Sequence, residues 1–264
     1  MSTTTQTATR SANTDVQTLA AGTYRYRVEV LRVASPVVLE VGLAPVGEHL
    51  PFRPGQHAML GVREPDVPER AYSIANAPRP DGRVRLLVTR YAGGITSGWI
   101  HDRLARGDEV ILDGPHGSLV ADPSLDGPVL LLAAGCGVAP VSAVAESLLA
   151  SQPHREVTLL FSGRTPAHLL QRTRFEDLQR RHEQFSYDFT LTRDRSSRWH
   201  RRVPHMLGRL IGDLSGWEVF IAGNEHFVRA SRDAVHVLGA EASSVHTEEF
   251  LADPSPQLEC QPVS

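Results

Sequence analysis

Apolar and polar residues alternate with a period of two in the first half of the chain. The pattern is clear in residues 24–33 (YRYRVEVLRV) and 83–89 (RVRLLVT), with shorter apolar runs at 37–42, 58–62 and 109–112. Turn signals at Pro51 and at Pro54–Gly55 separate these runs. Short strands divided by glycine and proline turns predict an antiparallel β-barrel or sandwich.

The pattern changes after Asp122–Gly127. Strand-like runs then alternate with segments of helical spacing: strands at 128–134, 157–162, 185–192, 218–222 and 244–247, and helices at 139–151, 167–182 and 227–239. This alternation predicts a doubly wound parallel sheet with helices on both faces. We expect a disordered tail at 1–22, an antiparallel β-barrel domain at 23–124, an α/β domain at 125–250 and a C-terminal tail at 251–264.

Composition narrows the class of protein. A chain of 264 residues with 41% hydrophobic content suits two domains, and a net charge of −3 argues against nucleic acid as the main partner. There is no apolar run of about 18 residues and no apolar leader, so we expect a cytoplasmic protein without a membrane span or secretory signal. All 27 basic residues are arginine, which excludes lysine chemistry.

The cysteines and histidines show no metal-binding pattern. Cys136 and Cys260 are the two cysteines, too few for a four-thiolate iron–sulfur cluster or zinc site. The histidines, among them His57, His101, His116, His200 and His246, show no metal-ligand spacing. We therefore expect no metal in this chain.

The segment Gly135-Cys136-Gly137-Val138-Ala139-Pro140 directly follows the apolar run 129–134. Glycines permit a tight turn and close approach to a phosphate, and proline is tolerated in the first turn of a helix. The segment predicts a phosphate-binding strand-to-helix turn, and a purely structural turn is the alternative. Cys136 beside a helix N-terminus has either a lowered thiol pKa or a simple filling role.

Two segments in the first half also carry polar chemistry. Arg70-Ala71-Tyr72-Ser73 is predicted to be a strand that places a cation and an aromatic ring on one face, or else a strand with a surface arginine and a half-buried tyrosine. Gly93-Gly94-Ile95-Thr96-Ser97 supplies backbone and hydroxyl donors for a phosphate. The alternative there is a connection to a helix capped by Ser97.

Taken together, these residues resemble the ferredoxin–NADP reductase superfamily over residues 24–250. Its R-x-Y-S signature matches Arg70 to Ser73, G-x-x-S matches Gly94 to Ser97, and G-x-G-x-x-P matches Gly135 to Pro140. Gly114-Pro115-His116-Gly117 resembles the turn closing the flavin barrel, Ala222-Gly223-Asn224 a family strand end, and Glu248-Glu249-Phe250 the closing acidic–aromatic segment. The stretch RAYSIANAP is most similar to reductase components of oxygenases, here without a fused [2Fe–2S] domain.

The resemblance implies an FAD-binding barrel followed by an NAD(P)-binding α/β domain. By family role, Arg70 holds the FAD pyrophosphate, Tyr72 stacks on the isoalloxazine, and Ser73 hydrogen-bonds near its N5 atom. The remaining residues implied for the flavin are Thr89, Arg90, Gly94, Thr96 and Ser97. Those implied for the nicotinamide nucleotide are Gly135, Cys136, Gly137 and Pro140.

Further residues are implied at the nicotinamide and adenosine ends. Glu248 is a candidate polar neighbour of the nicotinamide, or an exposed acid at a strand end, and Phe250 a candidate cover for the flavin. Together with Ser73 and Tyr72, Glu248 completes the expected catalytic set. Arg164 and Arg193 follow two strands of the α/β half, where arginine pairs with the 2′-phosphate of NADPH. NADH-using members also carry Arg-Thr at this place, which slightly favours NADH and leaves NADPH as the alternative.

The resemblance implies hydride transfer from nicotinamide C4 to flavin N5, followed by one-electron transfer to a separate ferredoxin, iron–sulfur protein or oxygenase. One alternative is a flavin reductase that supplies free reduced flavin to a monooxygenase. Another is a non-catalytic subunit that holds FAD for electron transfer or sensing. The arginines between 172 and 209 suit either a solvated surface or charge-steered docking of an acidic acceptor. We expect a monomer.

Overall fold

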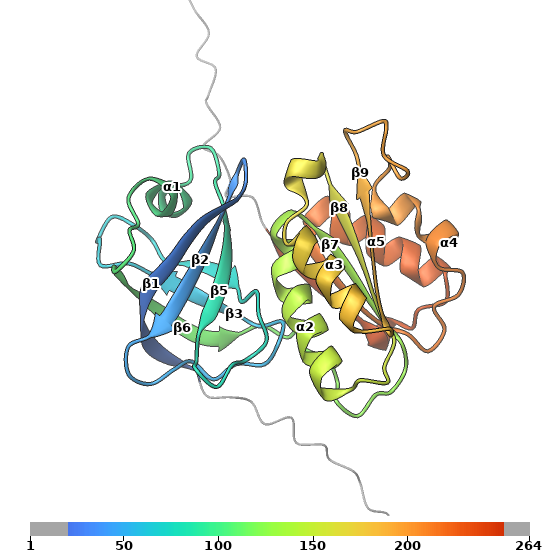
Figure 1. The fold of residues 1–264 in the computed structure, drawn as a ribbon, viewed down its shortest axis with the longest axis horizontal. Helices are drawn as coiled ribbons and strands as arrows, with labels where there is room; N and C mark the ends of the chain where they lie inside the picture. The colour runs from blue at the N-terminus through green and yellow to red at the C-terminus, as the bar shows by residue number, and fades with distance from the viewer. Residues whose placement is uncertain (1–20, 251–264) are drawn as a thin grey trace, which may run out of the picture.

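The computed structural model describes residues 21–250, which form two β-sheets that lie side by side (Figure 1). The predicted tails at 1–22 and 251–264, and Cys260 within the second, fall almost entirely outside the described residues. The two sheets meet in sequence between residues 117 and 128, the segment that contains the predicted boundary.

The first sheet is antiparallel and curls into a barrel-like shape. It has six strands in the order β4-β3-β6-β1-β2-β5. Their bounds are β1 Gly22–Ser35, β2 Val38–Pro45, β3 His57–Gly61, β4 Arg70–Ser73, β5 Val84–Thr89 and β6 Glu109–His116, and helix α1 spans Ile95–Asp102. The alternating pattern of the sequence is the cause, since inward residues such as Tyr26, Val28 and Leu60 are buried while their neighbours face outward.

The second sheet is parallel, with the strand order β11-β10-β7-β8-β9. Its strands are β7 Val129–Ala134, β8 Val157–Gly163, β9 Phe185–Leu191, β10 Glu218–Asn224 and β11 Val245–Phe250. Its helices are α2 Val138–Ser151, α3 Arg172–Arg181, α4 Leu207–Leu210 and α5 Glu225–Val237. Helices α2 and α3 cover one face and α4 and α5 the other (Figure 1). The predicted barrel followed by a doubly wound α/β unit is confirmed.

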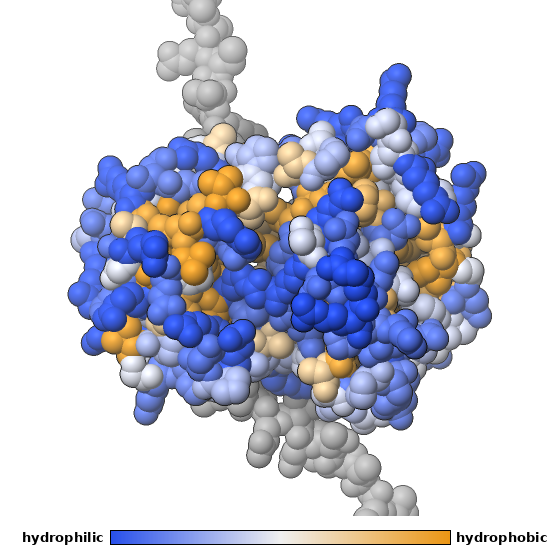
Figure 2. Space-filling view, viewed as in Figure 1, coloured by the Kyte–Doolittle hydropathy of each residue, from blue (hydrophilic) through white to orange (hydrophobic). Residues whose placement is uncertain are grey.

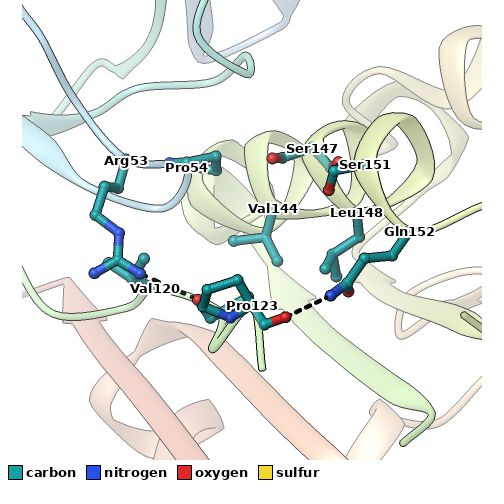
Figure 3. Close-up of a pocket in the computed structure, with 10 residues that line it drawn as sticks. Arg53, Pro54, Val120, Pro123, Val144, Ser147, Leu148, Ser151 and Gln152 are labelled. Carbon is teal, nitrogen blue, oxygen red and sulfur yellow. Dashed lines mark hydrogen bonds between the residues drawn. The ribbon is translucent and has the colours of Figure 1, made fainter. Parts of the chain in front are cut away.

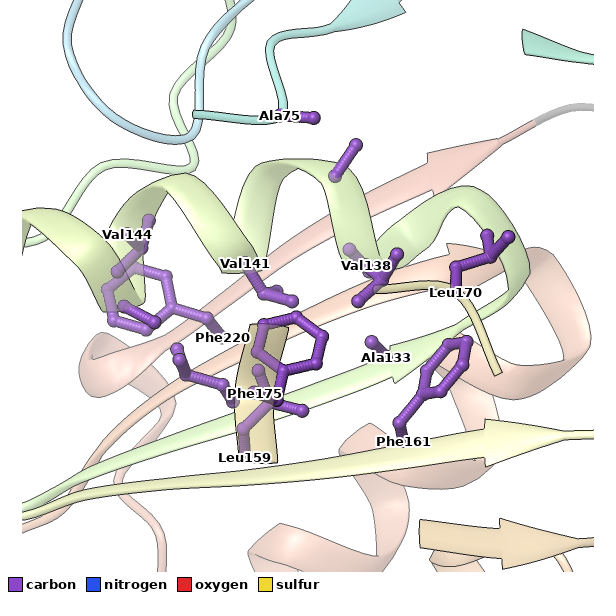
Figure 4. Close-up of a cluster of buried hydrophobic side chains, with 14 of the residues drawn as sticks. Ala75, Ala133, Val138, Val141, Val144, Leu159, Phe161, Leu170, Phe175 and Phe220 are labelled. Atoms are coloured by element: carbon purple, nitrogen blue, oxygen red, sulfur yellow. The ribbon is translucent and has the colours of Figure 1, made fainter. Parts of the chain in front are cut away.

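The interface between the sheets is built from one shared hydrophobic core. Val38, Ala75 and Leu87 of the antiparallel half belong to the same buried cluster as α2, β7 and β8. In Figure 4, Ala75 lies above α2, whose Val141 and the neighbouring Phe175 fill the space beneath the helix. Because burial of apolar area stabilises by about 25 cal/mol per Å², this shared core stabilises the contact between the two halves.

Three local predictions were wrong. The helix expected over 167–182 begins at Arg172, because Gln171 adopts a left-handed conformation (φ 56°) that separates it from a short 3₁₀ turn at Pro166–His168. The strand expected to end at Leu112 continues to His116, so Gly114–His116 is strand and the chain turns at Gly117 (φ 93°). Ser97 does not cap α1, because it is the helix's third residue.

No helix among the described residues is both long and apolar enough to cross a membrane.

Candidate functional site

The two sheets bring Ser73 and Glu248 together at the carboxyl edge of the parallel sheet. Ser73 ends β4 and is buried, while Glu248 lies in β11 beside Ala222 of β10. The Ser73 hydroxyl donates a hydrogen bond of 2.6 Å to Oε1 of Glu248. Burial raises the pKa of Glu248, and the bond from Ser73 opposes that shift in part. Residues 175 positions apart thus form one polar pair between the halves.

Thr89 and Cys136 form a second contact between the halves. Thr89 ends β5, Cys136 follows β7, and their Oγ1 and Sγ atoms are 2.8 Å apart. Burial raises the pKa of the Cys136 thiol to about 11, partly offset by the hydrogen bond with Thr89. The lowered thiol pKa considered from the sequence is therefore wrong, because desolvation outweighs the helix N-terminus. The filling role is the one that the structure supports.

The glycine turn after β7 has the form required for close approach to a ligand. Gly135 has a positive φ of 57° and open space where a side chain would project. A Cβ on Gly137 would come within 2.0 Å of the Ala222 carbonyl oxygen, so only glycine fits against β10. Helix α2 starts at Val138 with no side-chain cap and no acid in its first turn, and it includes the predicted Pro140. Its free N–H groups are available to an anion.

Helix α1 presents a second uncapped N-terminus. Its N-cap residue, Gly94, makes no side-chain hydrogen bond, and the first turn has no acid. The Thr96 hydroxyl donates to the Pro68 carbonyl, and Ser97 Oγ accepts from the Tyr91 N–H. Since these hydroxyls already hold the loop in place, the donors left for a phosphate are backbone N–H groups.

The remaining residues predicted for the flavin lie around this part of the barrel. Arg70 is exposed on β4, and Tyr72, two residues later, is half-buried against the barrel core. Arg90 follows Thr89 and forms two hydrogen bonds of 2.7 Å with Asp102 at the end of α1. Its guanidinium is therefore directed to the surface of the barrel half in this structure.

Arg164 and Arg193 are neighbours at the carboxyl ends of β8 and β9. The Arg193 N–H donates to the Arg164 carbonyl at 2.8 Å, and both residues are exposed. Phe250 ends β11 opposite Asn224 and packs, half-buried, against the shared core. These three residues therefore lie on the same edge of the sheet as Glu248.

Sequence reasoning missed His57 as a neighbour of this site. His57 pairs in register with Ser73 on one side and with His116 on the other, and its ring lies 5.8 Å from that of His116. Burial lowers the pKa of His57, and the charge of His116 adds to the effect. Only the strand register could reveal this proximity, since the three residues are far apart in the chain.

A hollow of about 200 Å³ also lies between the two halves, at the other end of α2 (Figure 3). Its lining includes Pro54, Val144 and Leu148, and two further lining residues, Arg53 and Gln152, donate hydrogen bonds to backbone carbonyls of the lining. None of the predicted site residues lines it. Among residues 21–250, no group of three His, Cys, Asp or Glu side chains is placed to hold a metal.

Comparison with known proteins agrees with this two-part arrangement. The family model described as the oxidoreductase FAD-binding domain matches residues 34–120, and that of the oxidoreductase NAD-binding domain matches residues 131–233. A ferredoxin–NADP reductase B of Sorangium cellulosum is 32% identical over 244 residues, which cover 88% of this chain and 99% of that protein. The reductase subunit of an Amycolatopsis aromatic O-demethylase is 30% identical, covering 83% of this chain and 70% of the relative.

Solved structures of similar fold also combine these two halves. The crystal structure of the Amycolatopsis cytochrome P450 reductase GcoB superposes with a TM-score of 0.81 at 29% identity, covering 87% of this chain and 70% of that chain. A ferredoxin NADP⁺ reductase from Neisseria gonorrhoeae with bound FAD and NADP superposes with a TM-score of 0.73 at 20% identity, covering 86% and 98%. At 20% identity, the similarity to the Neisseria reductase concerns the fold alone.

The fold and the two family models define an FAD-dependent NAD(P)H oxidoreductase. The chain belongs to the ferredoxin–NADP reductase family. Its residues fit both cofactors, because each half offers an uncapped helix N-terminus for phosphates and Gly135 leaves open space beside one of them.

Proposed function

We propose that this chain takes reducing equivalents from NADH or NADPH onto bound FAD and passes them singly to a separate ferredoxin, iron–sulfur protein or oxygenase. The observation that carries the proposal is the Ser73–Glu248 hydrogen bond, which joins the proposed flavin-binding half to the proposed nucleotide-binding half. Relatives named as reductase components of a dioxygenase and of a phenol monooxygenase support the choice of acceptor class. The chain spans 63% and 46% of those two relatives.

In this proposal, residues 23–124 hold the FAD. The N–H groups at the start of α1 and the guanidinium of Arg70 bind its pyrophosphate, and the Tyr72 ring packs on the isoalloxazine. Thr89 and Arg90 line the flavin together with the loop of Gly94, Thr96 and Ser97. When bound, FAD supplies the exchange between two-electron and one-electron chemistry that no side chain provides.

Residues 125–250 hold the nicotinamide nucleotide. Gly135, Cys136 and Gly137 let the backbone approach its phosphates, and the N-terminus of α2 around Pro140 contributes the positive end of the helix dipole. Arg164 and Arg193 face the adenosine end. Phe250 shields the junction from water at the end of β11.

Ser73 and Glu248 act where the two cofactors meet. Ser73 presents its hydroxyl at a fixed position because Glu248 accepts its hydrogen bond, and Glu248 is itself held between β10 and the barrel. Because both side chains are already oriented, little conformational entropy is lost when they contact the cofactors, and this keeps the barrier to hydride transfer low. Tyr72 completes the catalytic set by fixing the plane of the ring.

The test is an anaerobic absorbance titration of the FAD-loaded protein with NADH and with NADPH, followed by addition of ferredoxin. We expect bleaching of the flavin and turnover with a one-electron acceptor. Arg164→Gln and Arg193→Gln are expected to raise the KM for NADPH by about tenfold, the loss of one charge-assisted contact, with little change for NADH. Absence of bleaching with both nucleotides, or bleaching without reduction of any one-electron acceptor, overturns the proposal.

A further inference from the structure

A strongly basic hollow lies on the α/β half, and none of the residues proposed for the cofactors lines it. It has a volume of about 260 Å³ and lies between the loop that follows β9 and helix α4. Three arginines and two histidines line it, over a floor that includes Trp199 and Met206; the five basic residues are Arg198, His200, Arg201, His205 and Arg209. Strand β9 is the edge of the sheet, and α4 lies on the side of the sheet remote from the barrel (Figure 1).

No aspartate or glutamate among the described residues lines this hollow. From Arg195 to Gly212 the sequence contains five arginines, two histidines and no aspartate or glutamate. Within the part of the chain that the structure describes, Arg198, Arg201 and Arg209 form no ion pair with a carboxylate. Arginines elsewhere on this half do: Arg155 pairs with Glu218 and Arg172 with Glu176.

The hollow is also held in a defined shape. The Leu191 N–H at the end of β9 donates to the Trp199 carbonyl at 2.8 Å, and the Trp199 indole N–H donates to Asp188 at 3.1 Å. Arg198 stacks on the Trp199 ring, with 4.9 Å between the guanidinium carbon and the ring centroid. Met206, which also lines the hollow, is buried, and its carbonyl accepts the Arg209 backbone N–H. These contacts fix the backbone on both sides of the hollow and the Arg198 guanidinium, which lowers the ordering cost of binding there.

We propose that the basic hollow binds a small polyanion, either a phosphate ester or a polycarboxylate. Guanidinium groups match phosphate and carboxylate oxygens with paired N–H donors, and a cluster of such cations without acids gains the most from an anion that carries several charges. A volume of about 260 Å³ is below that of a drug-sized ligand site, which fits a compact metabolite rather than a whole dinucleotide. The macromolecular alternative, an acidic protein surface, would have to insert side chains into the hollow.

The site differs from the proposed nucleotide site. Arg164 and Arg193 are not part of its lining, although Arg193 belongs to the same loop after β9. The experiment therefore uses the FAD-loaded protein with saturating NADP⁺, so that the nucleotide phosphates occupy their own place. Inorganic pyrophosphate and citrate serve as the two probes, at an ionic strength kept constant with sodium chloride.

Isothermal titration calorimetry and thermal unfolding are measured on the wild-type protein and on Arg201→Gln, Arg209→Gln and their double variant. The matched control is Arg232→Gln, which removes one exposed arginine from α5 outside the hollow. We expect saturable binding of at least one probe, weakened by about 10- to 100-fold in each hollow variant and unchanged in the control.

Preference for pyrophosphate or for citrate identifies the phosphate or the carboxylate class. Three results overturn the proposal: a non-saturating response with both probes, equal weakening in Arg232→Gln, or unchanged binding in the double variant. The last would place the bound anion elsewhere on the protein. Because the substituted residues Arg201, Arg209 and Arg232 are exposed, the variants are expected to fold, and their circular dichroism spectra check this.

Discussion

The Ser73–Glu248 pair gives the sharpest test of the proposed site. The bond is short, at 2.6 Å, and involves a buried hydroxyl and a half-buried carboxyl group. A hydrogen bond to a charged group contributes about 1.5–3 kcal/mol, which corresponds to a change of roughly 10- to 150-fold in a rate that depends on it. We therefore expect Ser73→Ala and Glu248→Gln each to slow flavin reduction by NAD(P)H within that range.

The assay is stopped-flow reduction of the FAD-loaded protein under anaerobic conditions, with the nucleotide varied to separate its binding from the rate at saturation. The double variant should lose little more than the slower single variant, because the two residues act as one unit. Ser186→Ala, an exposed strand serine on β9, is the control. Losses that multiply in the double variant, or single variants as fast as the control, would refute the coupling inferred from the structure.

Three other predictions rest on buried polar groups. Burial raises the pKa of Glu248, so its contribution to stability is present below the unfolded pKa and is lost as pH rises through the folded pKa. The free energy of unfolding of Glu248→Gln, measured in urea at a series of pH values upward from about 4, should therefore rise relative to that of the wild type, and a difference that does not change with pH contradicts this. In a Cys260→Ser background, Cys136 should react with iodoacetamide about 100-fold more slowly at pH 7 than a free thiol, given its pKa of about 11; alkylation at the ordinary rate, followed by mass spectrometry, would show that the thiol is not desolvated. Glu218→Gln should cost about 3–5 kcal/mol in urea unfolding, because it leaves the fully buried Arg155 guanidinium, 2.7 Å away, without its carboxylate; a loss below about 1 kcal/mol would mean that the charge is solvated.

The parts of the fold that depend on local pattern could be predicted from the sequence. Alternation along β1 and β5 marks the barrel, and the apolar run of β7 followed by glycines marks the turn at Gly135–Gly137. These signals are local because side-chain periodicity and the steric limits of glycine act within a few residues. The start of α3 could not be predicted, because the left-handed residue that precedes it, Gln171, is not a glycine and no local signal marks the break.

The functional contacts depend on distances that no local pattern contains. A helix N-terminus beside Cys136 argues for a reactive thiolate, yet Thr89 arrives from the other half of the protein and covers the sulfur. Desolvation then sets the direction of the pKa shift, since taking a thiolate out of water costs more than the helix dipole returns. The same reasoning applies to Glu248, which in sequence was equally an exposed acid at a strand end. Only the docking of β11 beside β4 makes it a half-buried partner of Ser73, so the chemistry of this site is a property of the interface between the two halves.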